Sequence, residues 1–286
     1  MTKNEQWTTI IKPKNGWFDL HLKELFKYKD LIFLFVKRNF VSRYKQTILG
    51  PAWAVIQPLL TTVVFTIVFG NIANLGTDGA PEFVFYMCGN IAWSYFSTCF
   101  TSTATTFVSN AGIYGKVYFP RLVIPISTVL TNLISFGIQL AFFLCFWLYY
   151  LIKGSIAPTL WVIAIPVLIV QMALLGLGFG IIVSALTTKY RDLTMLVSFG
   201  VQLWMYATPI AYPLSLINNK LGGSIWSKIY MLNPMTPIIE LFRKAFLGTG
   251  SVQITYLIIG FAATLIILFF GIMLFSRVEK TFMDTV

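Results

Sequence analysis

Charged residues are scarce in this chain of 286 residues. They make up 11% of it, against 57% hydrophobic residues, whereas ordinary soluble domains carry roughly 25% charge. This composition favours a membrane protein over a soluble fold. A helix needs about 20 apolar residues to cross a bilayer, so the long uncharged stretches predict six transmembrane helices. Six long stretches contain no Asp, Glu, Lys or Arg: 46–77, 83–115, 122–152, 154–188, 193–219 and 245–276.

Groups that carry chemistry are also few. His21 is the only histidine, and no Gly-x-x-x-x-Gly-Lys-Ser/Thr phosphate-binding loop is present. Cys88, Cys99 and Cys145 match no metal-binding or redox spacing and are expected to be small core residues. The predicted spans lack the ionisable groups that proton-coupled and ion-coupled transporters need. We expect no catalytic residue, no metal site and no cofactor in this chain. The energy for any transport must therefore come from a partner, unless the protein is a passive channel.

The charges that exist are unevenly placed. The net charge is +11, and 16 of the 21 Lys and Arg residues fall on one side of the membrane if the N-terminus is cytoplasmic. The positive-inside rule therefore predicts cytoplasmic N- and C-termini. The positive charge is explained by topology and anionic lipids, and nucleic acid is not expected as a partner. The charged N-terminal segment lacks the apolar core of a signal peptide, so the first span is expected to act as an uncleaved insertion signal.

The stretch from Val41 to Leu60, VSRYKQTILGPAWAVIQPLL, passes from basic sequence into uncharged sequence. Gly50 tolerates a bend and Pro51 suits the first turn of a new helix. We therefore predict that a basic amphipathic interface helix meets the first span here. Pro209, Pro213, Pro234 and Pro237 divide a later segment into apolar pieces too short to cross, which predicts re-entrant or outer-face helices between spans five and six. The expected segments are 1–18 (polar), 19–50 (interface helix), 51–276 (permease domain, with loop 110–121 and outer segment 209–250) and 277–286 (cytoplasmic tail).

The six spans are placed from the uncharged runs, and glycines mark one of them. Gly176, Gly178 and Gly180 in the fourth span predict close contact with neighbouring helices. The expected spans are 51–73, 83–108, 122–150, 159–186, 193–208 and 254–275.

Several short motifs occur in an order that resembles the polysaccharide ABC exporter permeases of the O-antigen, teichoic acid and capsule types, in the type-2 ABC export family. The resemblance covers about 20–276. The motifs are Arg43-Tyr44-Lys45-Gln46, Leu49-Gly50-Pro51, Trp53, Gln57-Pro58, Lys116–Arg121 with Pro125, Tyr190-Arg191-Asp192, Pro209-Ile210, and Asn233-Pro234 with Glu240 and Arg243.

The resemblance implies a homodimer of permeases in the bacterial inner membrane, docked on two separate ATP-binding subunits that hold ATP and Mg. The complex would export a lipid-linked polysaccharide, with O-antigen favoured, from cytoplasm to periplasm. Two copies can also form a glycan-wide path between them, which six helices alone would hardly enclose. Alternatives are a permease of the same fold for a drug or lipid, a multispan glycosyltransferase and a structural scaffold.

Three groups of site residues are expected. By similarity, the interface helix and loop 110–121 couple to the ATPase, with Lys116 and Arg121 alternatively serving only topology. The coupling residues are Arg38, Arg43, Lys45, Asn110, Tyr114, Lys116, Tyr118, Phe119, Pro120 and Arg121.

The second group is a pair of helical stripes whose aromatic faces can stack on sugars and whose polar groups can bond sugar hydroxyls. Helix packing is the alternative. The stripe residues are Trp53, Gln57, Thr61, Phe65 and Phe69 in span one and Ser198, Gln202, Tyr206 and Pro209 in span five, and Trp204 lies close to the second stripe and is expected to line the channel with it. The third group concerns the gate and the outer face, where the spacing of Glu240 and Arg243 predicts an ion pair. Its members are Arg191, Asp192, Pro209, Asn233, Pro234, Glu240 and Arg243.

Overall fold

The computed structural model describes residues 22–114, 116–117, 119–187, 190, 192–222 and 224–281. These residues form helices joined by turns, with no strand among them. In chain order the helices are α1 (Leu22–Lys27), α2 (Lys29–Tyr44), η1 (Gly50–Ala52), α3 (Trp53–Phe65), η2 (Thr66–Ile72), α4 (Glu82–Ala104), α5 (Thr106–Ser109), α6 (Ala111–Tyr114), α7 (Val123–Ile152), η3 (Leu160–Ala164), α8 (Ile165–Thr187), α9 (Leu193–Tyr206), α10 (Leu214–Leu221), α11 (Ile225–Leu232), α12 (Met235–Leu247) and α13 (Ile254–Thr281).

Four helical segments are long and apolar enough to cross a membrane: Gly50–Ile72, Val123–Ile152, Leu160–Thr187 and Ile254–Arg277. The other two expected spans correspond to α4 and α9. Helix α4 has 23 residues but is rich in Ser and Thr, and α9 has only 14 residues. By length and hydropathy the described residues therefore contain four clear spans, against the six expected.

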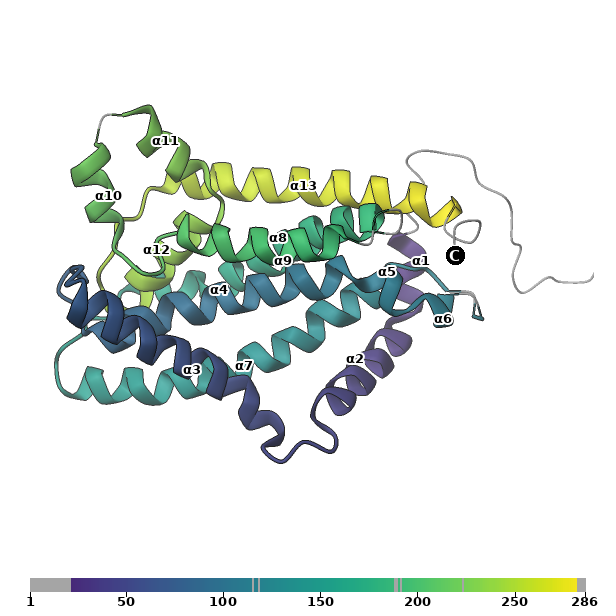
Figure 1. Cartoon of the computed structure of the whole chain (residues 1–286), viewed down its shortest axis with the longest axis horizontal. Helices are drawn as coiled ribbons and strands as arrows, with labels where there is room; N and C mark the ends of the chain where they lie inside the picture. The colour runs from purple at the N-terminus through teal and green to yellow at the C-terminus, as the bar shows by residue number, and fades with distance from the viewer. Residues whose placement is uncertain are drawn as a thin grey trace, which may run out of the picture.

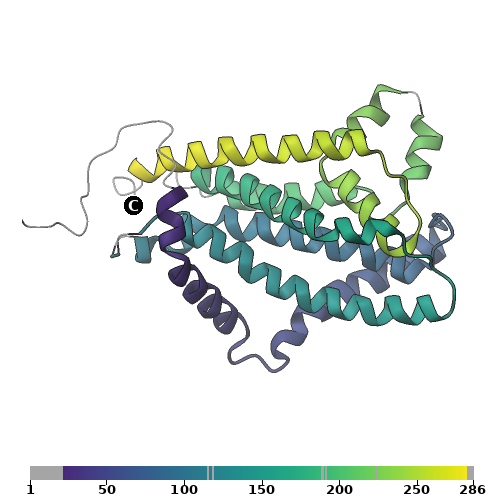
Figure 2. The same ribbon diagram turned by 180° about the vertical axis from the view of Figure 1, so that it is seen from behind.

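The long helices run side by side, and α4 lies among them (Figures 1 and 2). Glycines in α8 bring it close to its neighbours. A Cβ added to Gly176 would lie 2.7 Å from Cys99 Cβ on α4, and one added to Gly178 would lie 3.1 Å from Leu268 Cα on α13. Such short separations leave no room for a side chain, so the close contacts expected from these glycines are present.

Helices α2 and α3 meet at a corner that lies away from the other helices (Figure 1). Gln46 and Gly50 both have positive φ, 63° and 50°, so the backbone cannot continue as a helix through this corner. The interface helix expected over 19–50 is divided. The helix is interrupted at Tyr28, between α1 and α2, and α2 ends at Tyr44. On α2, Ile32 and Phe35 are buried, and the helix packs against α7.

The end of the bundle opposite α1 carries α10, α11 and α12 (Figure 1). Proline precedes two of them, with Pro213 at the N-cap of α10 and Pro234 at the N-cap of α12. Helix α12 has 13 residues, too few to cross a bilayer, yet almost all of its side chains are buried. It ends at Gly248, whose φ of 79° is the left-handed conformation common at helix C-termini.

Candidate functional site

Aromatic rings connect α2 to the loop after α6. The Phe119 side chain is buried, and its ring centroid lies 5.8 Å from that of Phe35 on α2 and 5.9 Å from that of Tyr114 on α6. Tyr114 lies 5.7 Å from Phe107 on α5, which stacks at 4.3 Å on Phe275 of α13. Because packed interiors transmit strain, we expect a shift of α2 to displace these rings and, through them, α5 and the end of α13.

Two of the charged residues expected to couple to an ATPase, Arg121 and Arg38, lie against these rings. The Arg121 guanidinium lies 5.7 Å from the Tyr114 ring centroid, and the Tyr114 hydroxyl donates to the Arg121 carbonyl over 3.2 Å. The Arg38 guanidinium lies 4.5 Å from the Phe35 ring. Lys116 is exposed.

Three further coupling candidates sit in different settings. Lys45 is exposed at the corner, and Pro120 is half-buried before α7. Asn110 donates from its side chain to the Thr106 carbonyl over 3.0 Å, inside its own turn. Tyr118 and Arg191 lie outside the described residues.

Arg43 points toward α7. Its Nη2 donates to Asn132 Oδ1 over 3.0 Å and its Nη1 donates to Ser135 Oγ over 3.5 Å. The hydroxyl groups of Tyr44 and Ser135 are 3.1 Å apart. These bonds fasten the end of α2 to α7. Asn132 and Ser135 were not among the expected site residues; the only hint in the sequence is that they are polar residues in an uncharged run.

The same residues border a cavity of about 330 Å³ among α2, α3, α4 and α7. Trp53 and Gln57, from the predicted stripe of span one, lie on its α3 side. Its polar lining comes from all four helices: Arg43, Gln57, Ser94, Ser97, Thr98, Asn132, Ser135 and Gln139 among others.

The rest of the α3 stripe becomes progressively buried. Trp53 and Gln57 are exposed, and Thr61 is half-buried with its hydroxyl donating to the Gln57 carbonyl over 3.1 Å. Phe65 is buried, and its ring meets that of Phe69 edge-on at 5.1 Å. Within one chain, the part of this stripe accessible to a passing ligand is therefore its first half.

On α9 the predicted residues face two directions. Trp204 is half-buried, its ring centroid lies 5.1 Å from that of Phe96, and its Nε1 donates to Asn233 Oδ1 over 3.1 Å. The exposed residues are Ser198, Gln202 and Tyr206. The structure thus joins Trp204 to Asn233 and separates it from the accessible face of α9.

Asn233 holds the turn between α11 and α12. Its Nδ2 donates to the Ala207 carbonyl over 3.2 Å and to Thr208 Oγ1 over 3.0 Å, while its Oδ1 accepts from the Met235 N–H over 3.1 Å. Pro209 is buried and Pro234 is half-buried beside this turn. Asp192 is exposed at the start of α9.

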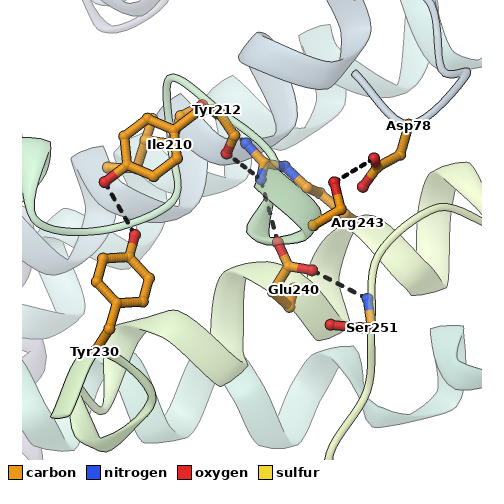
Figure 3. Close-up of polar contacts among 8 residues, drawn as sticks. Asp78, Ile210, Tyr212, Tyr230, Glu240, Arg243 and Ser251 are labelled. Carbon is orange, nitrogen blue, oxygen red and sulfur yellow. Dashed lines mark hydrogen bonds and ion pairs between the residues drawn. The ribbon is translucent and has the colours of Figure 1, made fainter. Parts of the chain in front are cut away.

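A buried charge pair lies in α12. Arg243 is 0% exposed and Glu240 is 2% exposed, and their side chains form an ion pair with Nη1 and Oε1 3.3 Å apart (Figure 3). Arg243 Nη2 also donates to the Ile210 carbonyl over 2.8 Å, and Nη1 donates to the Tyr212 carbonyl over 3.4 Å. Its guanidinium carbon lies 3.6 Å from the centroid of the Phe85 ring on α4.

The Glu240 carboxylate bonds the backbone just after the outer segment 209–250, before α13. Its Oε2 accepts from the Ser251 N–H over 3.0 Å, just after Gly250, whose φ is 104°. Burial raises the pKa of Glu240, and the Arg243 charge opposes that shift. The pair therefore ties the chain before α10 and the chain before α13 to one helix.

Two outer contacts complete this region (Figure 3). The Tyr230 hydroxyl donates to the Tyr212 hydroxyl over 3.1 Å, and Ser215 Oγ donates to Asp78 Oδ1 over 2.6 Å. The second bond joins α10 to the turn that precedes α4. Across the described parts of the chain, no three His, Cys, Asp or Glu side chains are grouped so as to hold a metal ion.

The sequence of the chain matches a known family. The family model described as "ABC-2 type transporter" matches residues 30–247. An O-antigen export system permease protein RfbA of Klebsiella pneumoniae is 29% identical over 255 residues, which cover 89% of this chain and 94% of that protein. The RfbA protein of Myxococcus xanthus is 31% identical over 225 residues, covering 79% and 83%. The polysialic acid transport protein KpsM of Escherichia coli is 23% identical over 261 residues, covering 87% and 93%.

Proposed function

The chain belongs to the ABC-2 type transporter family, and we propose that it is the permease subunit of an exporter for a lipid-linked polysaccharide of the O-antigen type. The substrate would move from the cytoplasm to the periplasm. The observation that carries this proposal is the similarity to O-antigen export permeases over most of both chains.

We propose that two separate ATP-binding subunits, with ATP and Mg bound to them, supply the energy. The exposed Lys116 and the buried Phe119 lie on one loop, which presents a charge outward and a ring against α2. Arg43 in turn joins α2 to α7. This arrangement supports transmission of a displacement of the loop or of α2 into the bundle. The ring contact with α2 and the Arg43 bonds to α7 lie in packed surroundings, and packed interiors transmit strain.

The glycan path is proposed to form between two copies of the chain. Trp53 on α3 is 51% exposed and Tyr206 on α9 is 56% exposed, and both helices pack on α4. Exposed aromatic rings interspersed with Gln57 and Gln202 give weak stacking and hydrogen-bonding contacts. Many weak contacts suit a polymer that must slide, and the mostly apolar exposed faces of α3 and α9 suit burial against a second copy or lipid.

The proposed topology has six spans, with both termini in the cytoplasm of a bacterial inner membrane. Helix α4 crosses while shielded by its neighbours, which allows it more Ser and Thr than a lipid-facing helix. Helix α9 has 14 residues and crosses together with the turn that follows it. The outer segment 209–250, anchored by Glu240 and Arg243, then lies on the periplasmic side and borders the exit.

Gene deletion and complementation in the source bacterium test this function. Loss of the gene should remove the surface polysaccharide and leave lipid-linked glycan in the cytoplasmic leaflet, and the restored gene should reverse both. Unchanged surface polysaccharide in the deletion strain would overturn the proposal.

A further inference from the structure

A buried acceptor lining the α2–α3–α4–α7 cavity has no hydrogen-bond partner: it is Oε1 of Gln139 on α7, a residue 9% exposed. The hydroxyl of Tyr95 on α4, a residue 2% exposed, lines the same cavity and interacts with the thiol of Cys99, a weak partner that leaves the hydroxyl able to accept a hydrogen bond. Buried polar atoms in proteins are nearly always paired. The unpaired Gln139 oxygen beside this hydroxyl indicates a ligand that carries hydroxyl groups of its own.

The remaining lining favours a neutral ligand. Ser94 and Thr98 contribute hydroxyls and Gln57 an amide, and none of the described residues that line the cavity is acidic. Arg43 is the cation among the described lining residues, and its guanidinium already bonds Asn132 and Ser135. An anion would have to compete with these bonds, whereas a sugar hydroxyl can donate to a Gln139 oxygen and exchange a bond with a Tyr95 hydroxyl without disturbing them.

Size and position agree with this chemistry. The volume of about 330 Å³ is at the low end of the roughly 300–1,000 Å³ of small-molecule pockets, which suits roughly one or two sugar rings. Trp53 borders the cavity and is also exposed on α3, so its indole can cover the C–H face of a sugar.

We infer that this cavity is a binding subsite for neutral sugar units, set in the wall of each permease copy beside the main path. The inference rests on the proposed export function and adds a site at which the glycan is recognised. Tyr95 and Gln139 are the residues that bond the sugar hydroxyls, and Trp53 covers the ring.

Protection of a cysteine placed in the cavity tests the subsite. Ser94→Cys is made in a Cys145→Ser background, because Cys145 is exposed while Cys88 and Cys99 are buried. The chain is reconstituted with its ATP-binding subunit in nanodiscs, and the reaction rate with a small methanethiosulfonate reagent is measured. The probes are methyl glycosides of neutral hexoses and oligosaccharides released from the cell's own surface polysaccharide. We expect these probes to slow the reaction, with no slowing at Cys145 in the unmodified chain.

Matched variants separate binding from packing. Tyr95→Phe and Gln139→Leu should each weaken the protection about five- to tenfold, the effect of losing one hydrogen bond, with thermal stability unchanged. Tyr86→Phe and Gln171→Leu are the controls, because both residues are buried with an unpartnered atom but do not line this cavity. The controls should retain full protection.

Three outcomes would overturn the inference: protection by inorganic phosphate or by phosphatidylglycerol in the nanodisc but not by sugars, protection by no probe, or equal losses in the controls. Export of surface polysaccharide by the cysteine variant is recorded in parallel. Export that persists while the cavity shows no protection would remove the subsite and leave the proposed function standing; absent export in the unmodified chain would remove the function itself.

Discussion

Replacing Arg243 with methionine removes the cation from the centre of the outer segment. The unmodified guanidinium is fully buried, pairs with Glu240 and donates to the carbonyls of Ile210 and Tyr212. Arg243→Met leaves the Glu240 carboxylate buried without its partner, a situation that costs about 3–5 kcal/mol. We expect the free energy of unfolding, measured by titrating the purified chain with SDS, to fall by that amount.

Two further variants resolve the contributions. Arg243→Lys keeps a positive charge but cannot reach both carbonyls and the carboxylate together, so a loss of about 1.5–3 kcal/mol is expected from the weakened charged hydrogen bonds. In Glu240→Gln/Arg243→Met no buried charge is left unpaired, and the double variant should be less destabilised than the sum of its two single variants.

Lys244→Met is the matched control, because Lys244 is the next residue of α12 and its side-chain Nζ donates to the Gly248 carbonyl just after the last turn. It should cost about 0.3–1 kcal/mol. Equal losses for Arg243→Met and Lys244→Met would refute the argument that the buried pair holds this segment.

Three other predictions concern coupling, the path and the core. Lys116→Glu, at an exposed position, should reduce export severalfold while the partner continues to hydrolyse ATP; unchanged export would remove this residue from coupling. Trp53→Ala and Tyr206→Ala should lower surface polysaccharide per cell more than they lower permease abundance, and a proportional fall in both would indicate packing instead. Gly176→Leu should cost about 1–3 kcal/mol by overpacking against α4, whereas Gly200→Leu, with open space around it, should cost far less; equal stabilities in the SDS titration would contradict the close α4–α8 contact.

Much of the helical order could be predicted because hydrocarbon imposes long uncharged runs. The corner is an example: Gly50 and Pro51 mark the start of the first span, and η1 begins at Gly50. The spacing of Glu240 and Arg243 likewise predicts their pairing, which depends only on one helical turn.

Tertiary partners could not be predicted in the same way. Arg43 reads as a surface cation in a basic helix, yet its partners Asn132 and Ser135 are about ninety residues away on α7, and no local pattern encodes that separation. Trp204 lies two positions from Tyr206, which puts it on the opposite side of α9, but its partner there, Asn233, lies 29 residues along the chain and is encoded by no local pattern. Which face of a span is buried depends on its neighbours, since an apolar helix in a bilayer is apolar on all sides.

The most direct test of the account is transport by the purified components in proteoliposomes. The chain, its ATP-binding subunit and a lipid-linked O-antigen-type glycan are reconstituted, and glycan reaching the opposite leaflet is measured by its accessibility to an added glycosidase. The account predicts ATP-dependent transfer only when both subunits are present. Transfer by this chain alone against a gradient, or ATP hydrolysis by the full complex without any transfer of glycan, would contradict it.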